Sequence, residues 1–202
     1  MPDIKHFDPD AALDAAMRLF WRQGVDSTGI QDVVDTTGLN RSSLYATFGG
    51  KQQLYLAALR RYGEQRADRA FRGMAEDDRG LPAVTDFFTG LIEVRCSGEF
   101  AGWGCMVANA LAGAGSAENG DPEVQALVER QHNSLREALR TALTTARSLG
   151  QLAPVTDPDA AAEVLALLAY GVNLRSRAGA DAATLRRAVS SAVAALSVSG
   201  AE

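Results

Sequence analysis

Four of the six prolines stand at the start of long stretches of helix-forming residues, and their placement constrains the fold strongly. The four are Pro9, Pro82, Pro122 and Pro158. Proline is tolerated in the first turn of a helix because the amide that it lacks has no helical partner there. Asp8, Asp121 and Asp157 directly precede three of these prolines, where a carboxylate can cap free amides. Since no stretch shows a convincing period-two strand pattern, the sequence predicts an all-α protein.

Glycines and apolar spacing divide this all-α chain into nine expected helices. Gly24, Gly38 and the Gly49–Gly50 pair separate the first four. The expected ranges are about 9–23, 29–36, 40–47, 51–74, 82–97, 103–113, 122–148, 158–176 and 182–198.

The charge is unevenly distributed along the chain, which carries a net charge of -5. Residues 38–72 hold seven Lys and Arg against two acids, whereas residues 1–37 and 73–202 are both acidic. A local basic stretch can meet phosphate whatever the overall charge. An Arg-rich, solvated helix face explains Arg60 to Arg72 equally well, so both interpretations stay open.

Composition excludes several classes of protein. The chain is 47% hydrophobic, and no run approaches the roughly 18 apolar residues of a membrane span. The acidic amino terminus lacks an apolar signal core, so we expect a cytoplasmic protein without membrane contact. Cys96 and Cys105 are too few for a disulfide scaffold, and two histidines, His6 and His132, offer little for a metal site. We therefore expect no metal and no cofactor.

The segment 27–51, STGIQDVVDTTGLNRSSLYATFGGK, carries the functional signal. Two short helices meet at Gly38, which can adopt the left-handed backbone of a tight turn. Asn40 stands where a helix cap belongs. The second helix would then expose short or planar donors suited to base edges and phosphates, namely Arg41, Ser42, Ser43, Tyr45 and Thr47. This pattern predicts a helix-turn-helix whose second helix enters the major groove of DNA.

The same segment resembles the amino-terminal domain of the TetR/AcrR family of transcriptional regulators over about residues 8–60. The resemblance is carried by Gly24, Thr28–Gly29, Ile30, Val33, Gly38–Leu39–Asn40, Ser43–Leu44–Tyr45, Phe48 and Lys51. The sequence departs from the family pattern at Gly29, Thr37 and Thr47, where Ser, Ala and an aromatic residue are usual. These departures affect two expected phosphate contacts and leave the domain intact.

The resemblance implies a TetR-like fold, with a helix-turn-helix DNA-binding domain over residues 1–50 and a helical effector-binding and dimerisation domain over 51–202. It implies a homodimer that contacts its partner through about residues 158–198 and reads double-stranded DNA at a palindromic operator. The function expected is that of a regulator, most often a repressor released by a small, largely apolar ligand. The alternative for 158–198 is a purely intramolecular core. On the dimer interpretation, charge at Leu168 or Val189 should give monomers or insoluble protein.

Individual DNA contacts follow from the same resemblance. Thr28 and Lys51 would hold phosphates on the two flanks of the motif, and Tyr45 would extend its phenol to the DNA backbone. Thr47 would add a weaker hydroxyl contact. The base-reading residues would be those at the amino end of the second helix: Arg41, Ser42 and Ser43. The alternatives are a half-buried packing role for Tyr45 and a capping or solvated lysine at Lys51.

The aromatic-rich region 87–109 is expected to line an apolar ligand cavity, because the family has one between its fourth and seventh helices. The candidate ligand residues are Phe88, Trp103, Met106 and Asn109. Plain core packing is the alternative for the apolar side chains. A buried Asn109 amide needs hydrogen-bond partners, so it would orient a ligand or tie its helix to a loop.

Two other functions compete with this one. Cys96 or Cys105 could act as a thiol-based redox sensor in a DNA-binding regulator. A small-molecule-binding enzyme on a helical scaffold would need a cluster of acids, bases or metal ligands in its cavity. The sequence contains no such cluster, so we expect a protein without catalytic residues.

Overall fold

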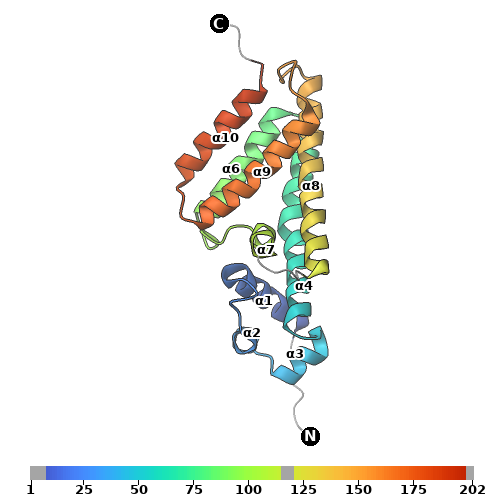
Figure 1. Cartoon of the computed structure of the whole chain (residues 1–202), viewed down its shortest axis with the longest axis vertical. Coiled ribbons are helices and arrows are strands. Elements are labelled where there is room, and N and C mark those ends of the chain that lie inside the picture. Colours follow the sequence, from blue (N-terminus) through green and yellow to red (C-terminus); the bar gives the residue numbers. More distant parts are fainter. Residues whose placement is uncertain (1–7, 115–120, 199–202) are drawn as a thin grey trace.

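A computed structural model describes residues 8–114 and 121–198, and it is helical almost throughout. Its elements are α1 (Pro9–Gln23), α2 (Ile30–Thr37), α3 (Arg41–Phe48), α4 (Lys51–Tyr62), the π-helical turn η1 (Gly63–Ala67), α5 (Asp68–Ala75), α6 (Leu81–Cys96), α7 (Met106–Ala114), α8 (Pro122–Ser148), α9 (Pro158–Arg177) and α10 (Ala182–Leu196). Figure 1 shows α1, α2 and α3 at one end and α6, α9 and α10 at the other, with α4 and α8 running between them. The predicted all-α class is confirmed.

The aspartates before three prolines cap their helices as expected. The Asp8 carboxylate accepts a hydrogen bond from the Asp10 amide at 2.9 Å, and Asp121 and Asp157 accept from amides in the first turns of α8 and α9. Asp181 caps α10 in the same way without a proline. Side-chain acceptors at these positions satisfy amides that would otherwise lack a partner, which explains why the helices begin there.

The expected helix over 51–74 is interrupted by the π-helical turn η1. Gly63 opens this turn, and a Cβ atom built there would lie 2.8 Å from Nε2 of Gln131 on α8. The Gln131 side chain would have to move to admit a larger residue at this point. Extra turns of this type widen a helix locally and often mark functional sites. The interruption places η1 against the carboxyl half of the molecule.

The expected helix over 103–113 begins only at Met106. Gly102 and Gly104 adopt left-handed backbone conformations, with φ of 73° and 66°. A Cβ atom at Gly104 would lie 3.1 Å from the backbone oxygen of Asn173 on α9. The loop before α7 therefore lies tightly against α9.

Two apolar cores hold these elements together. One lies among α6, α8, α9 and α10 and includes Phe88, Leu139 and Val189. The other joins α1 to α4 with α7 and the first turns of α8, and it includes Trp21 and Met106. The amino-terminal helices thus share a core with the carboxyl half. No described helix is both long and apolar enough to cross a bilayer.

Candidate functional site

The turn between α2 and α3 has the geometry that the sequence predicts. Gly38 is left-handed, with φ of 70°, and its amide donates to the Val34 carbonyl. The Asn40 carboxamide oxygen accepts from the Ser43 amide at 2.8 Å and from the Ser42 hydroxyl at 2.7 Å. Val33, Leu39 and Leu44 are buried beneath the turn. These contacts hold α3 across α2 with its outer face free.

The outer face of α3 carries the predicted DNA-contacting side chains. Arg41, Ser42 and Thr47 are exposed and Ser43 is half-buried. Tyr45 is 55% exposed, so the packing interpretation does not describe it in this structure. The Arg41 guanidinium has no carboxylate partner among residues 8–114 and 121–198. Arg41, Tyr45 and Thr47 are therefore exposed on the outside of α3, next to Ser42, whose hydroxyl also donates to Asn40.

Thr28 and Lys51 lie elsewhere and face the protein. Thr28 is buried, and its hydroxyl donates to the Gly24 carbonyl at 2.6 Å. The Lys51 ammonium donates to the Val25 carbonyl at 2.9 Å and to the Thr28 carbonyl at 2.8 Å. As placed here, both side chains brace the loop after α1 against the start of α4. Lys51 thus has the capping role that the sequence left open.

Much of the basic stretch 38–72 is occupied by intramolecular contacts. Arg60 pairs with Glu123 at 3.0 Å. Arg61 pairs with Asp10 at 2.8 Å and with Asp14 at 2.5 Å. The hydrogen bond from Arg61 lowers the pKa of the Asp14 carboxyl. These two arginines join α4 to α8 and to α1, and phosphate binding by the basic stretch stays a prediction.

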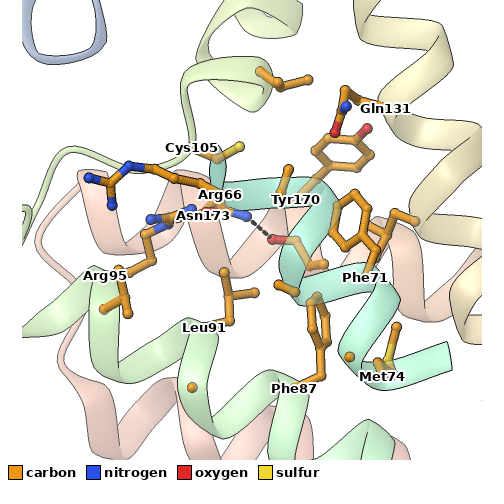
Figure 2. Close-up of a pocket in the computed structure, with 18 of the residues that line it drawn as sticks. Arg66, Phe71, Met74, Phe87, Leu91, Arg95, Cys105, Gln131, Tyr170 and Asn173 are labelled. Carbon is orange, nitrogen blue, oxygen red and sulfur yellow. Dashed lines mark hydrogen bonds between the residues drawn. The ribbon is translucent and has the colours of Figure 1, made fainter. Parts of the chain in front are cut away.

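A cavity of about 560 Å³ lies in the carboxyl half, within the range of small-molecule sites. Its walls come from η1, α5, α6, α8, α9 and the residues around the start of α7. Figure 2 shows Arg66, Arg95, Asn173 and Cys105 on one side, and Phe71, Met74 and Phe87 on the other. The cavity therefore has a polar end and an apolar end.

Hydrogen bonds organise the polar end. The Arg95 Nε atom donates to the Asn173 carboxamide oxygen at 2.6 Å, and its Nη2 donates to the Tyr62 hydroxyl at 3.0 Å. Burial raises the pKa of Tyr62, so its phenol stays protonated. Asn173 in turn donates to the Ala169 carbonyl. Arg95 is thus held by neutral groups from α4 and α9.

None of the four predicted ligand residues lines this cavity. Phe88 is fully buried in the core among α6, α8, α9 and α10. Trp103 packs against Trp21 and Phe100, with ring centroids 5.3 Å and 5.2 Å away. Met106 and Asn109 line a second hollow beside α1 and α8. The Asn109 amide donates to the Trp103 carbonyl at 2.9 Å, so it ties α7 to the preceding loop.

Sequence reasoning missed the side chains that do line the cavity. On α6 they are Phe87, Leu91, Val94 and Arg95, which follow one another at the spacing of a single helix face. That spacing was the available signal, and the adjacent Phe88, about 100° further around the helix, packs into the core. Cys105 lines the cavity, whereas Cys96 lies outside it, and both are free thiols. The described residues contain no His, Cys, Asp and Glu group placed to hold a metal, and His6 lies outside them.

The outer face of α9 carries an exposed apolar row. Its members are Val164, Leu167 and Leu174, and Leu167 is 59% exposed. In contrast, Val189 of α10 is buried in the core of its own chain, and Leu168 is half-buried against that core. Charge at Leu168 or Val189 would therefore disturb folding, whereas Leu167 faces outward.

Comparisons with known proteins agree with this architecture. The family described as "Bacterial regulatory proteins, tetR family" matches residues 12–58, and "Tetracyclin repressor-like, C-terminal domain" matches residues 80–192. The HTH-type transcriptional repressor ComR of Escherichia coli is 30% identical over 178 residues, covering 88% of this chain and 83% of its own. The uncharacterized HTH-type transcriptional regulator YezE of Bacillus subtilis is 28% identical over 148 residues, covering 73% and 74%.

A solved structure shares the whole fold. A cysteine mutant of the TetR family transcriptional regulator CifR, complexed with 26-bp double-strand operator DNA, superposes with a TM-score of 0.79. The match covers 96% of this chain and 99% of that chain at 23% identity. The match therefore extends over both regions that the two family models cover.

Proposed function

The chain belongs to the TetR family of bacterial regulatory proteins, and from this premise we propose that it is a homodimeric transcriptional repressor. It binds a palindromic operator through α3 and leaves it when a small molecule fills the cavity. Its place of action is the cytoplasm, where the DNA is. The observation that carries the proposal is the outer face of α3, which stays free while the turn beneath it is satisfied internally.

The side chains on α3 divide into two roles. Arg41, Ser42 and Ser43 stand in the first turn and read base edges in the major groove. Tyr45 and Thr47 lie further along the helix and contact the DNA backbone. Thr28 and Lys51 support them through the braced loop, because a direct phosphate contact would require Lys51 to release two carbonyls.

Association of two chains supplies the palindromic symmetry. A two-fold dimer places two copies of α3 on equivalent half-sites. The exposed row on α9 offers an apolar surface that one chain leaves uncovered, and small residues on α10, such as Ala188, Ala194 and Ala195, leave room for a partner helix. We assign the dimer surface to the outer faces of α9 and α10, within residues 158–198.

The cavity can reach the DNA-binding helices through two contacts. The η1 turn continues α4, which begins at Lys51 beside the helix-turn-helix. At the end of α9, the Arg177 guanidinium donates to the Trp103 carbonyl at 2.9 Å and to the Arg22 carbonyl of α1 at 3.3 Å. A ligand acts only if it binds one spacing of the two DNA-binding domains more tightly than the other.

Regulation fits the cavity better than catalysis. Asp77 and Asp86 at its rim both pair with Arg79. Its buried arginine is held by neutral partners. General acid–base work most often uses a free His, Asp or Glu, and the two carboxylates of the described lining are both paired with Arg79. The DNA-binding and cavity geometry together favour a ligand-responsive regulator without an active site.

Footprinting on the DNA upstream of the gene tests operator binding. We expect protection of a palindrome at near-physiological salt, with much weaker protection of a scrambled site. Arg41→Ala should relax preference at one position in each half-site, while Arg140→Ala on α8 serves as the control. Equal binding to palindrome and scrambled DNA would contradict the repressor function even with the fold correct.

Sedimentation tests the dimer surface separately. Leu167→Glu should shift the protein toward monomers, because a charge would be buried at the centre of the α9 row. Val155→Glu is the matched control, since this loop valine is 94% exposed and lies outside the helices. An unmodified chain that sediments as a monomer would remove the proposed assembly.

A further inference from the structure

We infer that the cavity binds an amphipathic organic anion, with its carboxylate between Arg66 and Arg95 and its apolar body against Phe71 and Phe87. The inference rests on the proposed function, because it names the ligand class of that regulatory site. Four observations carry it: the burial of Arg95, the unpaired Arg66, the apolar opposite end and the pairing of the acids at the rim.

Arg95 is a buried charge without a counter-ion. It is 7% exposed, and its hydrogen bonds go to the neutral Asn173 carboxamide and Tyr62 phenol. Burying a charge is costly unless an opposite charge and hydrogen bonds compensate for it. No carboxylate of residues 8–114 or 121–198 pairs with this guanidinium. The missing charge can come from a bound anion.

Arg66 adds a second positive charge at the same end. Its Nε atom is buried and has no hydrogen-bond partner within residues 8–114 and 121–198. Its guanidinium lies over the rings of Phe100, at 4.3 Å, and Trp21, at 5.0 Å, and the Arg95 guanidinium lies 5.6 Å from the same Trp21 ring. The two guanidinium groups therefore both lie near the same indole, and like charges repel. A carboxylate that accepts from both would relieve this repulsion, and Arg–carboxylate hydrogen bonds are among the strong ones.

The opposite end suits an aliphatic or aromatic body. Phe71, Met74 and Phe87 lie away from the two arginines, as Figure 2 shows, and Leu91 lies between them and Arg95. A cavity of about 560 Å³ holds a small amphiphile.

The acids of the cavity are already neutralised. Asp77 and Asp86 stand at the rim, and the exposed Arg79 pairs with them at 2.5 Å and 2.8 Å. The hydrogen bond from Arg79 also lowers the pKa of Asp77, so that carboxyl stays ionised and paired. A cationic ligand would therefore compete with Arg79 for these acids, whereas an anionic ligand finds unpaired donors.

The anion site borders the DNA-binding half of the molecule. Trp21 belongs to α1, is fully buried, and donates from its indole nitrogen to the Gly104 carbonyl at 2.9 Å. An anion that draws Arg66 and Arg95 toward itself weakens their contact with this indole. The position of α1 would then respond to the charge of the ligand as well as to its volume.

Calorimetry on the full chain tests the ligand class with three probes of equal chain length. The probes are decanoate, decanol and decylamine, each below its micelle-forming concentration. We expect decanoate to bind at least tenfold more tightly than decanol, and decylamine to bind most weakly. Equal or tighter binding of decanol or decylamine would overturn the inference without any variant.

Two variants locate the anion site. Arg66→Gln and Arg95→Gln should each reduce the preference for decanoate over decanol several-fold. Arg72→Gln, at an exposed arginine of α5 outside the cavity lining, is the matched control and should keep the preference. Circular dichroism checks that each variant is folded. If Arg95→Gln does not fold, Arg66→Gln alone tests the assignment. If the folded variants keep the whole preference for decanoate over decanol, the assignment of the anion site to these arginines is overturned.

An operator-binding assay separates this inference from the proposed function. If decanoate binds with the expected preference but the protein stays on its operator, release by ligand fails and the ligand class stands. If decanol releases the operator as well as decanoate does, the ligand class fails and the regulatory function stands.

Discussion

The helix-turn-helix and the cavity hold the same charged group in opposite surroundings. Arg41 on α3 is exposed and has no carboxylate partner among the described residues, so its charge is solvated until DNA arrives. Arg95 on α6 is 7% exposed and depends on Asn173 and Tyr62 for its hydrogen bonds. An exposed arginine can change without disturbing the fold, whereas a buried one is part of it.

This difference in burial separates the residues that set DNA specificity from the residues that respond to a ligand. The outer face of α3 touches little of its own chain, so substitutions there should change which DNA is read and leave folding alone. The polar end of the cavity contacts α1, α4 and α9 at once through Arg95, Arg66 and Trp21. A change there reaches several helices together, which is what a ligand-sensing site requires.

Replacing the buried indole against which Arg66 and Arg95 lie should have the largest effect. Trp21→Ala removes a fully buried ring that packs against Tyr62, Phe100 and Trp103. We expect the free energy of unfolding to fall by about 3–5 kcal/mol, as for other buried Trp and Phe truncations. Urea unfolding measures it. Tyr45→Ala, which removes an exposed ring on α3, should change the same quantity by less than about 0.5 kcal/mol.

The two arginines themselves give the next largest contrast. Arg95→Met keeps much of the apolar stem but deprives the Asn173 carboxamide oxygen and the Tyr62 hydroxyl of a donor. We expect a loss of about 2–4 kcal/mol in unfolding free energy, since each unsatisfied buried group costs about 1–3 kcal/mol. Arg41→Met is the matched surface change. If Arg95→Met and Arg41→Met lost similar amounts of unfolding free energy, the contrast between a buried and an exposed arginine would be contradicted.

The helix-turn-helix could be predicted from the sequence because its determinants are local. Gly38, Asn40 and the apolar residues between them lie within one short segment, and backbone conformation and capping follow from residue type. The same holds for the helix starts at Asp-Pro steps. The turn at Gly38 and the Asn40 cap are confirmed in the structure, while the DNA contacts on α3 stay predictions.

The cavity could not be predicted in the same way because its walls come from segments far apart in the chain. Arg95 meets Asn173 across 78 positions and Tyr62 across 33. Aromatic enrichment pointed to region 87–109, but it could not distinguish Phe87, which lines the cavity, from Phe88, which lies in the core. The π-helical turn η1 had no sequence signal beyond Gly63.

A third prediction concerns the exposed face alone. Arg41→Ala should cost about 1–3 kcal/mol of preference for one base in each half-site, whereas Tyr45→Ala should weaken binding to all sequences alike. Because Arg60, Arg61 and Lys51 have internal partners, few phosphates are neutralised and affinity should fall only moderately with salt. Gel shifts with single-base operator variants at two salt concentrations measure both effects. A uniform loss in Arg41→Ala would assign this residue to the DNA backbone.

The smallest expected effect on stability concerns an ion pair that is more buried than Arg41 and less buried than Arg95. Arg61 donates to Asp14 and thereby lowers the pKa of that carboxyl below 3.8, and the pair joins α4 to α1. The Asp14 side chain is 43% exposed, so solvent screens the pair and it contributes about 0.2–1 kcal/mol. Because the pKa is lower in the folded state, this stability is present at neutral pH and is lost as pH falls through the lowered value.

Asp14→Asn should therefore destabilise the protein slightly at pH 7, and its difference from the unmodified chain should shrink below about pH 3.8. Urea unfolding at pH 7 and pH 3 measures the two differences, and Asp78→Asn, at an exposed aspartate, is the control. We expect the loss of unfolding free energy from breaking this half-exposed pair to be intermediate. It should exceed the loss from replacing Arg41, which should be near zero, and stay below that from replacing Arg95, which should be several kcal/mol. If the difference between Asp14→Asn and the unmodified chain did not depend on pH, the contact would act through helix packing and not through charge. The expected rise of an arginine's contribution to stability with its burial would then not hold for Arg61.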